Sequence, residues 1–256
     1  MFNWGGFTLF LYILMRISGM VLLNPIFGRN GIPRLFQAGF IGIISISTYN
    51  LTQGSAPFPD TAIEFGLRLL MELGVGAILS MVMRFFFLIA EQGGEVVDTQ
   101  MGLSMARTYD PSSQSNMTIT SSILNLMMMV LFFLGNGHVT LLRLIMTSGE
   151  LLPFGTVTLG PSAADRMLEL FAECALLSVK VSLPILGAEL LGQIGMGILM
   201  KVIPQINVFA INIELKVIIG FVMLLLLLAP MGEFLLDCEA DMLRQRRSLL
   251  AQLHGS

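Results

Sequence analysis

The sequence predicts an all-α membrane protein, and three observations carry this prediction. Hydrophobic residues make up 55% of the 256 residues and charged residues only 12%, whereas soluble domains carry about 25% charged residues. The mean hydropathy is +0.81. Six apolar blocks follow one another along the chain, and a helix that spans a bilayer needs about 20 mostly apolar residues. We therefore expect six to seven apolar helices, some of them broken or kinked.

The apolar blocks cover residues 5–27, 35–51, 63–90, 117–152, 166–200 and 202–232. The fourth block is interrupted at residues 135–138 ("GNGH") and predicts either one helix or two. By the positive-inside rule, the basic cluster at residues 244–247 places the C-terminus inside, and Arg29 and Arg34 place the first loop inside too. Six spans cannot satisfy both placements, whereas seven can, so the number of spans stays open.

Charged residues lie in the middle of several of these blocks, among them Arg16, Glu72, Arg84, Lys180, Glu189 and Glu214. A charge at the centre of a membrane-spanning helix costs about 2.5–3.5 kcal/mol on the insertion scale. A bundle surrounded only by lipid would avoid this cost, whereas an assembly with protein or water against several helix faces tolerates it. We therefore expect the chain to need partner subunits.

One membrane-type stretch, "KVIPQINVFAINIELKVIIG" at residues 201–220, is unusually polar. Drawn as one helix, it has two nearly opposite polar stripes, one with Lys201, Gln205, Asn212 and Lys216 and the other with Asn207 and Glu214. A peripheral helix needs one polar face, so two stripes predict a helix sandwiched between partners. The alternative is that Pro204 breaks the helix and Asn207 caps a new one, which would cancel these angles.

Three carboxylates follow the third block, at Glu91, Glu95 and Asp98, and share one helical face if the helix continues through Gly93 and Gly94. Such a cluster could bind a cation or basic residues of a partner. The alternative, which we favour, is a solvated helix end, because the apolar block stops near residue 90.

Other features predict structural roles. Glu64, Arg68 and Glu72 are spaced four residues apart and predict an internally paired stripe on one helix. Cys174 and Cys238 lie in apolar helical pattern without metal-ligand spacing, which favours buried thiols over a disulfide.

Heptad spacing marks the C-terminal segment, residues 233–253, as an amphipathic helix. Leucine and methionine recur every seven residues there, at Leu235, Met242 and Leu249 and at Leu236, Leu243 and Leu250. This pattern predicts either a seam for another helix or a helix lying on the membrane surface.

A hydroxyl-rich segment, "RTYDPSSQSNMTITSS" at residues 107–122, separates two strongly apolar blocks. Asp110–Pro111 is a turn signal. The segment is either an ordinary extramembrane loop or a loop folded into a cavity of the protein, since irregular backbone at membrane depth must be buried or line water.

We predict no catalytic, cofactor or metal site. The chain has two histidines, His138 and His254, and no Gly-x-Ser-x-Gly, His-x-x-x-His or phosphate-binding glycine loop. An intramembrane enzyme is therefore disfavoured. A secondary transporter with Glu214 and Lys216 at its midplane would show internal repeats with matched broken helices, and we find no convincing repeat.

Four motifs in order resemble the FliR family of flagellar biosynthetic proteins, whose equivalent in virulence injectisomes is the T component of the type III export apparatus. They are residues 16–33 ("RISGMVLLNPIFG…IP"), 94–111 ("GEVVDTQMGLSMARTYDP"), 136–138 ("NGH") and 204–209 ("PQINVF"). The motif residues that match the family are Gly94, Glu95, Gln100, Met101, Gly102, His138, Pro204 and Phe209. Members of the family often carry other residues at positions 97–99, so the resemblance gives Asp98 no role.

The resemblance implies a non-enzymatic, channel-forming subunit of the flagellar type III export gate, without a cofactor, in the bacterial inner membrane at the flagellar basal body. Implied partners are the P and Q proteins in a hetero-oligomeric ring, the B and A export components, unfolded export substrates and membrane lipid, with no nucleic acid. An injectisome subunit is the alternative. Residues 1–160 would be a P-like helical part and residues 161–235 a Q-like helical hairpin.

The family's plug loop would fall on the hydroxyl-rich segment, which favours the cavity interpretation of residues 107–122. Its candidate plug residues are Arg107, Tyr109, Asp110, Pro111, Asn116 and Met117. The two polar stripes of residues 201–216 would then face different neighbours in the ring.

Overall fold

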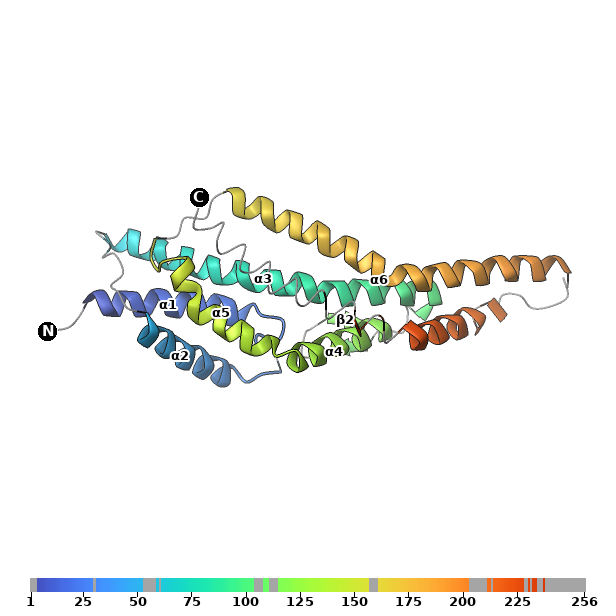
Figure 1. Ribbon diagram of the computed structural model, residues 1–256, viewed down its shortest axis with the longest axis horizontal. Helices are drawn as coiled ribbons and strands as arrows, with labels where there is room; N and C mark the ends of the chain where they lie inside the picture. The colour runs from blue at the N-terminus through green and yellow to red at the C-terminus, as the bar shows by residue number, and fades with distance from the viewer. Residues whose placement is uncertain are drawn as a thin grey trace. The chain divides into compact units, whose positions relative to one another are not determined.

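The computed structural model describes residues 4–29, 31–52, 59, 61–103, 108–110, 115–156, 161–202, 211–212, 214–227, 230, 232–233 and 237. Its elements are α1 (Trp4–Leu22), α2 (Arg34–Leu51), α3 (Ala62–Met101), β1 (Thr108–Asp110), β2 (Ser115–Met117), α4 (Ile119–Leu134), α5 (Gly137–Leu151) and α6 (Pro161–Val202) (Figure 1). Residues 211–212 and 214–227 are also helical. The predicted all-α membrane fold is confirmed, with one short β-hairpin that the sequence did not indicate.

Among the described residues, α1, α3 and α6 are long and apolar enough to span a membrane, and the bent pair α4–α5 would add a fourth span. The last apolar block, residues 202–232, is described only in part, so the number of spans expected from sequence stays a prediction. The interruption at residues 135–138 does separate two helices, and Asn136 takes the left-handed conformation there (φ 57°).

Two helices are much longer than a membrane crossing requires. α3 has 40 residues and α6 has 42, about twice the length that the hydrocarbon core needs. α3 continues for eleven residues past the apolar block that ends near residue 90, and α6 continues through Pro184. Roughly half of each helix is therefore free to lie against protein or water.

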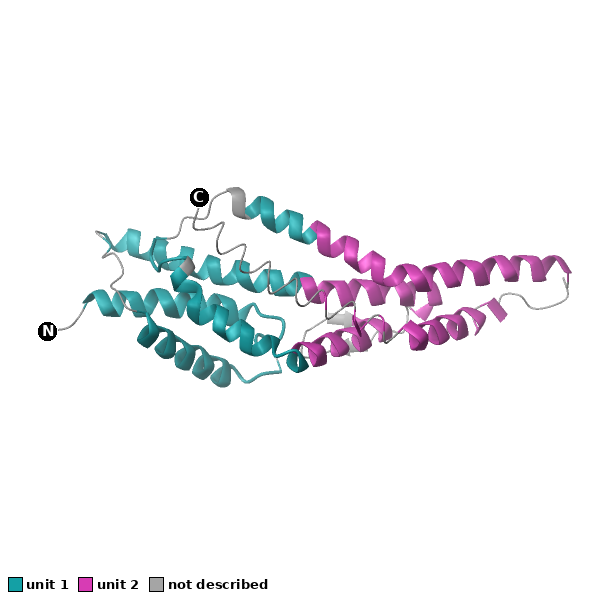
Figure 2. Cartoon of the chain, in the orientation of Figure 1, with its two compact units in different colours: residues 1–85, 133–171, 239–256 teal, residues 86–132, 172–238 magenta. Residues whose placement is uncertain are grey.

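The chain forms two compact units (Figure 2). Unit 1 comprises residues 1–85, 133–171 and 239–256, and unit 2 comprises residues 86–132 and 172–238. α3 and α6 each contribute to both units. The expected boundary near residue 160, between a P-like and a Q-like part, follows chain order and stays a prediction.

A buried ion pair organises unit 1. Arg16 on α1 is 2% exposed, and its Nε donates a hydrogen bond of 2.6 Å to Oε2 of Glu72 on α3. Its Nη1 donates to the carbonyl oxygen of Leu152 (2.9 Å), and its guanidinium lies 4.2 Å from the centre of the Phe154 ring. The backbone N–H of Gly155 donates to the other carboxylate oxygen of Glu72 (2.7 Å). These bonds offset much of the desolvation cost and tie α1, α3 and residues 152–155 together.

The charged stripe at the start of α3 is only partly paired within its own helix. Arg68 pairs with Glu64 at 2.5 Å, as predicted, but Glu72 turns to Arg16 instead. Arg68 also donates to the carbonyl oxygen of Gly155 (3.1 Å), so that glycine is bonded at both its N–H and its C=O. The pairing predicted for Glu72 was therefore wrong, because the buried Arg16 on another helix is a stronger partner than the half-buried Arg68.

Glycines let α1 and α3 approach each other closely. A Cβ at Gly19 would collide with the carbonyl oxygen of Leu73, and a Cβ at Gly76 would collide with that of Arg16. Small residues at such crossings are typical of membrane helices.

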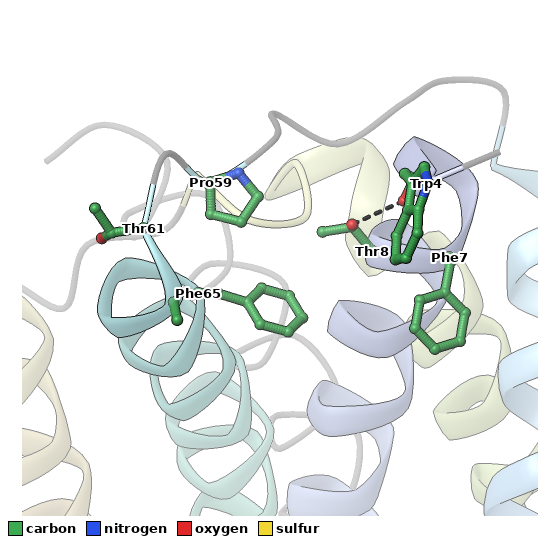
Figure 3. A pocket seen from close by; sticks show the side chains of 7 residues that line it. Trp4, Phe7, Thr8, Pro59, Thr61 and Phe65 are labelled. Carbon is green, nitrogen blue, oxygen red and sulfur yellow. Dashed lines mark hydrogen bonds between the residues drawn. The ribbon is translucent and has the colours of Figure 1, made fainter. Parts of the chain in front are cut away.

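An open apolar pocket of about 350 Å³ lies in unit 1, where α1 and α3 begin (Figure 3). It is lined by Trp4, Phe7, Thr8, Pro59, Thr61, Ala62 and Phe65. The pocket holds no charged side chain among these residues, so it offers shape and apolar surface only.

Candidate functional site: the hairpin between α3 and α4

β1 and β2 form an antiparallel hairpin between α3 and α4. Thr108 pairs with Met117, Tyr109 with Asn116 and Asp110 with Ser115. Met117 is buried. Of the other candidate plug residues, Tyr109, Asp110 and Asn116 have described backbone in the strands, whereas Arg107 and Pro111 lie outside the described residues.

The hydroxyl-rich segment is not a loop throughout. Its last four residues, 119–122, form the first turn of α4. Ser and Thr are common where a helix begins, because their hydroxyl groups replace missing backbone partners. The expectation of a loop through residue 122 was therefore too long at its C-terminal end.

The first turn of α4 is held by a carboxylate from α3. Asp98 is fully buried, and its Oδ2 accepts a hydrogen bond from the backbone N–H of Thr120 (2.7 Å). Its Oδ1 accepts a second hydrogen bond from the hydroxyl group of the same residue (2.5 Å). Backbone N–H groups in the first turn of a helix lack partners inside the helix, and carboxylates are favoured there. Asp98 thus supplies from another helix what a capping residue normally supplies from its own.

Asp98 corrects the interpretation of the carboxylate cluster. We favoured a solvated helix end after residue 90, but α3 continues to Met101 and buries Asp98. Glu95 stays half-buried. In the part of the chain that the structure describes, no group of three or more His, Cys, Asp or Glu side chains could hold a metal ion.

α3 and α4 touch backbone to backbone at the motif residue Gly94. A Cβ at Gly94 would collide with the backbone of Thr120 and Ser121. Ser121 also donates from its hydroxyl group to the carbonyl oxygen of Glu91 (2.6 Å), and Thr118 donates to the Ser121 hydroxyl (2.8 Å). Gly94 is therefore needed for the close packing of the α4 N-terminus on α3.

The motif residues Gln100, Met101 and Gly102 lie at the C-terminal end of α3. Met101 is fully buried in a cluster with Val97, Ile185 and Leu224. Gly102 follows with a φ of +78°, a left-handed conformation that ends helices and favours glycine. Gln100 is half-buried.

His138 lies at the start of α5, away from the hairpin in sequence. Its ring is 5.3 Å from that of Phe133, and its Nδ1 is buried without a hydrogen-bond partner within the described residues. Pro204 and Phe209 lie outside the described residues.

The polar stretch at residues 201–216 is described only in part. α6 ends at Val202, with Lys201 exposed on its last turn, and Gln205 and Asn207 lie outside the described residues. Beyond that gap Asn212 and Lys216 are half-buried and Glu214 is exposed. The two-stripe interpretation therefore stays a prediction.

These features define a class: a helical membrane protein that buries paired charges within long helices and carries a hairpin between two of them. The family model described as "Bacterial export proteins, family 1" matches residues 7–240. The chain belongs to this family. The predicted membership of the FliR family is thereby confirmed, as the relatives also indicate.

Similar proteins include flagellar biosynthetic proteins and a surface presentation of antigens protein. The flagellar biosynthetic protein FliR of Escherichia coli (strain K12) is 27% identical over 234 residues, which cover 89% of this chain and 88% of that protein. FliR of Bacillus subtilis (strain 168) is 23% identical over 250 residues, covering 96% and 95%. The surface presentation of antigens protein SpaR of Shigella sonnei is 26% identical over 211 residues, covering 77% and 81%.

Proposed function

We propose that this chain is a channel-forming subunit of the flagellar type III export gate and passes unfolded flagellar proteins across the bacterial inner membrane. Membership of a family of bacterial export proteins supports the proposal, as does similarity to FliR proteins over most of the chain. Three apolar helices long enough to span a membrane support the location. The proposal involves no catalysis and no cofactor.

The observation that carries the channel role is the hairpin of β1 and β2. It lies where the family resemblance places a plug, and each strand has three residues. An isolated two-stranded hairpin is marginally stable in water. Such an element can fill a narrow passage at rest and still yield to a passing chain, because three residue pairs join its two strands.

Unsatisfied surfaces support the proposed partners, namely the P and Q proteins in the ring, with the B and A components beside it. Arg84, Lys180 and Glu214 interrupt apolar blocks and are exposed in the chain by itself. Large apolar side chains are exposed along the C-terminal part of α6, among them Leu183, Leu190, Leu191, Ile194 and Ile198. The charged side chains are unfavourable in contact with lipid, and the apolar side chains are unfavourable in contact with water. Contact with other subunits would satisfy both sets.

A Q-like hairpin within residues 161–235 is supported by the packing of α6. Ile185 of α6 lies in one buried cluster with Leu224, and a Cβ at Gly192 would meet the Ile219 side chain. As the position on α6 rises from 185 to 192, its partner falls from 224 to 219, so the two helices run antiparallel.

Glu214 tests the partner contacts directly. Glu214→Leu should weaken assembly with the P and Q proteins, because the polar group that Glu214 meets in the partner would be left unpaired. Co-purification in detergent measures this. Improved folding with unchanged assembly and export would place Glu214 against lipid and would contradict the partner-facing assignment.

Similarity to SpaR supports a second candidate, an injectisome subunit. The two candidates separate in a strain that lacks this chain's gene. A flagellar subunit should be required for secretion of flagellin and for swimming, whereas an injectisome subunit should be required for secretion of virulence effectors. Normal secretion of both cargo classes without the chain would overturn the export function.

The plug role needs its own experiment. Replacing residues 109–116 with a short Gly/Ser linker should leave the complex assembled, since loop changes are tolerated where few buried contacts are lost. Cells with this variant should leak small solutes. The matched control replaces residues 53–58, between α2 and α3, in the same way and should not leak. If the hairpin variant assembles and cells with it leak no more solute than wild-type cells, the plug role is contradicted.

A further inference from the structure

The apolar pocket of unit 1 lies where α1 and α3 begin beside each other (Figure 3). Near these ends, the ring of Tyr12 on α1 lies 5.8 Å from the ring of Phe65 on α3. Further along, Asn24, just after α1, donates from Nδ2 to the sulfur of Met83 on α3 (3.2 Å). The contacts advance together along the two helices, which therefore run parallel and begin at the same end of unit 1.

This arrangement gives the pocket a defined depth in a membrane. Both α1 and α3 are long and apolar enough to span a bilayer. The 19 residues of α1 extend over about 28 Å at 1.5 Å per residue, which matches the roughly 30 Å of a hydrocarbon core. When α1 spans the membrane, its first residue, Trp4, lies at one edge of that core, where tryptophan is enriched. The pocket then opens at the depth where acyl chains begin.

The wall of the pocket offers hydrocarbon contact and little else. Its polar side chains are those of Thr8 and Thr61, and none of its lining residues is charged. The hydroxyl group of Thr8 donates to the carbonyl oxygen of Trp4 (2.8 Å), as Figure 3 shows, and that of Thr61 accepts from the backbone N–H of Glu64 (3.2 Å). Each hydroxyl group is thus already used within the chain. A ligand that needs hydrogen bonds would lose them here, whereas a hydrocarbon chain needs none.

Aromatic side chains form both the mouth and the inner wall. Trp4 is 64% exposed and Phe7 is 50% exposed, whereas Phe65 is half-buried. Its ring points into the space between α3 and the start of α1 (Figure 3). The pocket volume of about 350 Å³ is near the lower end of the roughly 300–1,000 Å³ of ligand pockets. Such a volume suits part of one chain and excludes a whole lipid.

We propose that this pocket binds one acyl chain of a membrane phospholipid, with the chain against the rings of Trp4, Phe7 and Phe65. The surrounding membrane supplies acyl chains at this depth, and the uncharged wall selects against the headgroup. An apolar side chain of a partner subunit is the competing occupant. The lipid site goes beyond the proposed function and does not depend on it.

The test uses the fluorescence of Trp4, which is the only tryptophan of the chain. The full chain is reconstituted into liposomes of phosphatidylcholine whose acyl chains carry bromine, because bromine quenches tryptophan on contact. We expect a loss of Trp4 emission relative to liposomes of the same lipid without bromine. Emission that bromine leaves unchanged would overturn the lipid site.

Two neighbouring substitutions separate a chain inside the pocket from lipid that merely surrounds Trp4. Ala62→Phe adds a ring to the pocket wall, so it should exclude the acyl chain and recover much of the emission. Ile63→Phe is the matched control, because Ile63 is 79% exposed and does not line the pocket. Equal quenching in wild type and both variants would overturn the site. Unfolding temperatures check that the variants fold, and Ala62→Leu replaces Ala62→Phe if the larger side chain prevents accumulation.

The same measurement on the complex with the proposed P and Q proteins separates lipid from a protein occupant. The complex that carries Trp4→Phe supplies the background from tryptophans of the other subunits. Quenching that persists in the complex supports the lipid site, and this arm decides if the chain cannot be reconstituted by itself. Quenching in the chain alone that disappears in the complex would assign the pocket to a partner side chain and overturn the proposal. Neither outcome bears on the export function, which the secretion experiment tests.

Discussion

Glu72 and Asp98 are both buried acids on α3, one in unit 1 and one in unit 2, yet they are satisfied in opposite ways. Glu72 pairs with the buried guanidinium of Arg16 and accepts from a backbone N–H. Asp98 accepts from the backbone N–H and the hydroxyl group of Thr120, which are both uncharged. Replacing Glu72 by an apolar residue leaves the buried charge of Arg16 without its partner, whereas replacing Asp98 leaves only neutral donors without an acceptor. We therefore expect the loss of Glu72 to cost more stability than the loss of Asp98.

Glu72→Leu is the substitution from which we expect the largest loss of stability. Removing one member of a buried ion pair costs about 3–5 kcal/mol because the other charge stays buried. We expect the variant to accumulate poorly in membranes and to unfold at a much lower temperature in detergent. Arg16→Met combined with Glu72→Leu should recover much of the loss, and a single variant as stable as wild type would show that the pair is unimportant.

Gly94→Ala should have the next largest effect. The added Cβ collides with backbone of α4, which must shift, and overpacking of this kind costs about 1–3 kcal/mol. Gly39→Ala on α2 is the control, since a Cβ there meets nothing within 4 Å. Thermal unfolding of the two variants measures the difference, and equal midpoints would contradict the close contact of α3 and α4.

Asp98→Asn tests the difference between the two acids with a smaller expected loss of stability. The amide keeps one acceptor for Thr120 and leaves no opposite charge behind, so we expect a loss of only about 1 kcal/mol. Glu72→Gln, measured side by side, should lose clearly more because Arg16 keeps its charge. Similar losses in the two variants would mean that the two acids are held alike.

The smallest effect is expected at the surface of α6. Arg166 and Glu169 form an ion pair of 2.7 Å in which the glutamate is 64% exposed. Exposed pairs contribute about 0–1 kcal/mol, so Glu169→Ala should leave the unfolding temperature nearly unchanged. A loss of stability comparable to that of Glu72→Leu would show that solvent exposure does not determine how much these ion pairs contribute to stability.

Much of the helical fold followed from the sequence because apolar blocks and turn residues are local signals. The break at residues 135–138 and the Glu64–Arg68 pair are examples. The motif at residues 94–102 includes Gly94, where α3 contacts α4, and its role as a site stays a prediction. The Ser and Thr residues at 118–122, at the start of the fourth apolar block, could have indicated the start of α4, since such residues signal a helix N-terminus.

The remaining features depend on partners far apart in the chain. Arg16 meets Glu72 56 positions later, and Asp98 meets Thr120 22 positions later. Arg16 and Glu72 were recognised as costly, whereas Asp98 was assigned to a solvated helix end, and nothing local says which helix supplies the partner of any of them. The length of α3 was missed for the same reason, since packing against α4 and α6 sustains it beyond the apolar block.

The most direct test of the proposed channel role is the passage of a small ion through the purified complex of this chain with the proposed P and Q partners. The complex is placed in liposomes loaded with potassium, and potassium efflux is measured for wild type and for the Gly/Ser replacement of residues 109–116. The account predicts tight wild-type liposomes and rapid efflux through the replacement. Equal tightness of both, with equal amounts of assembled complex in the liposomes, would contradict it.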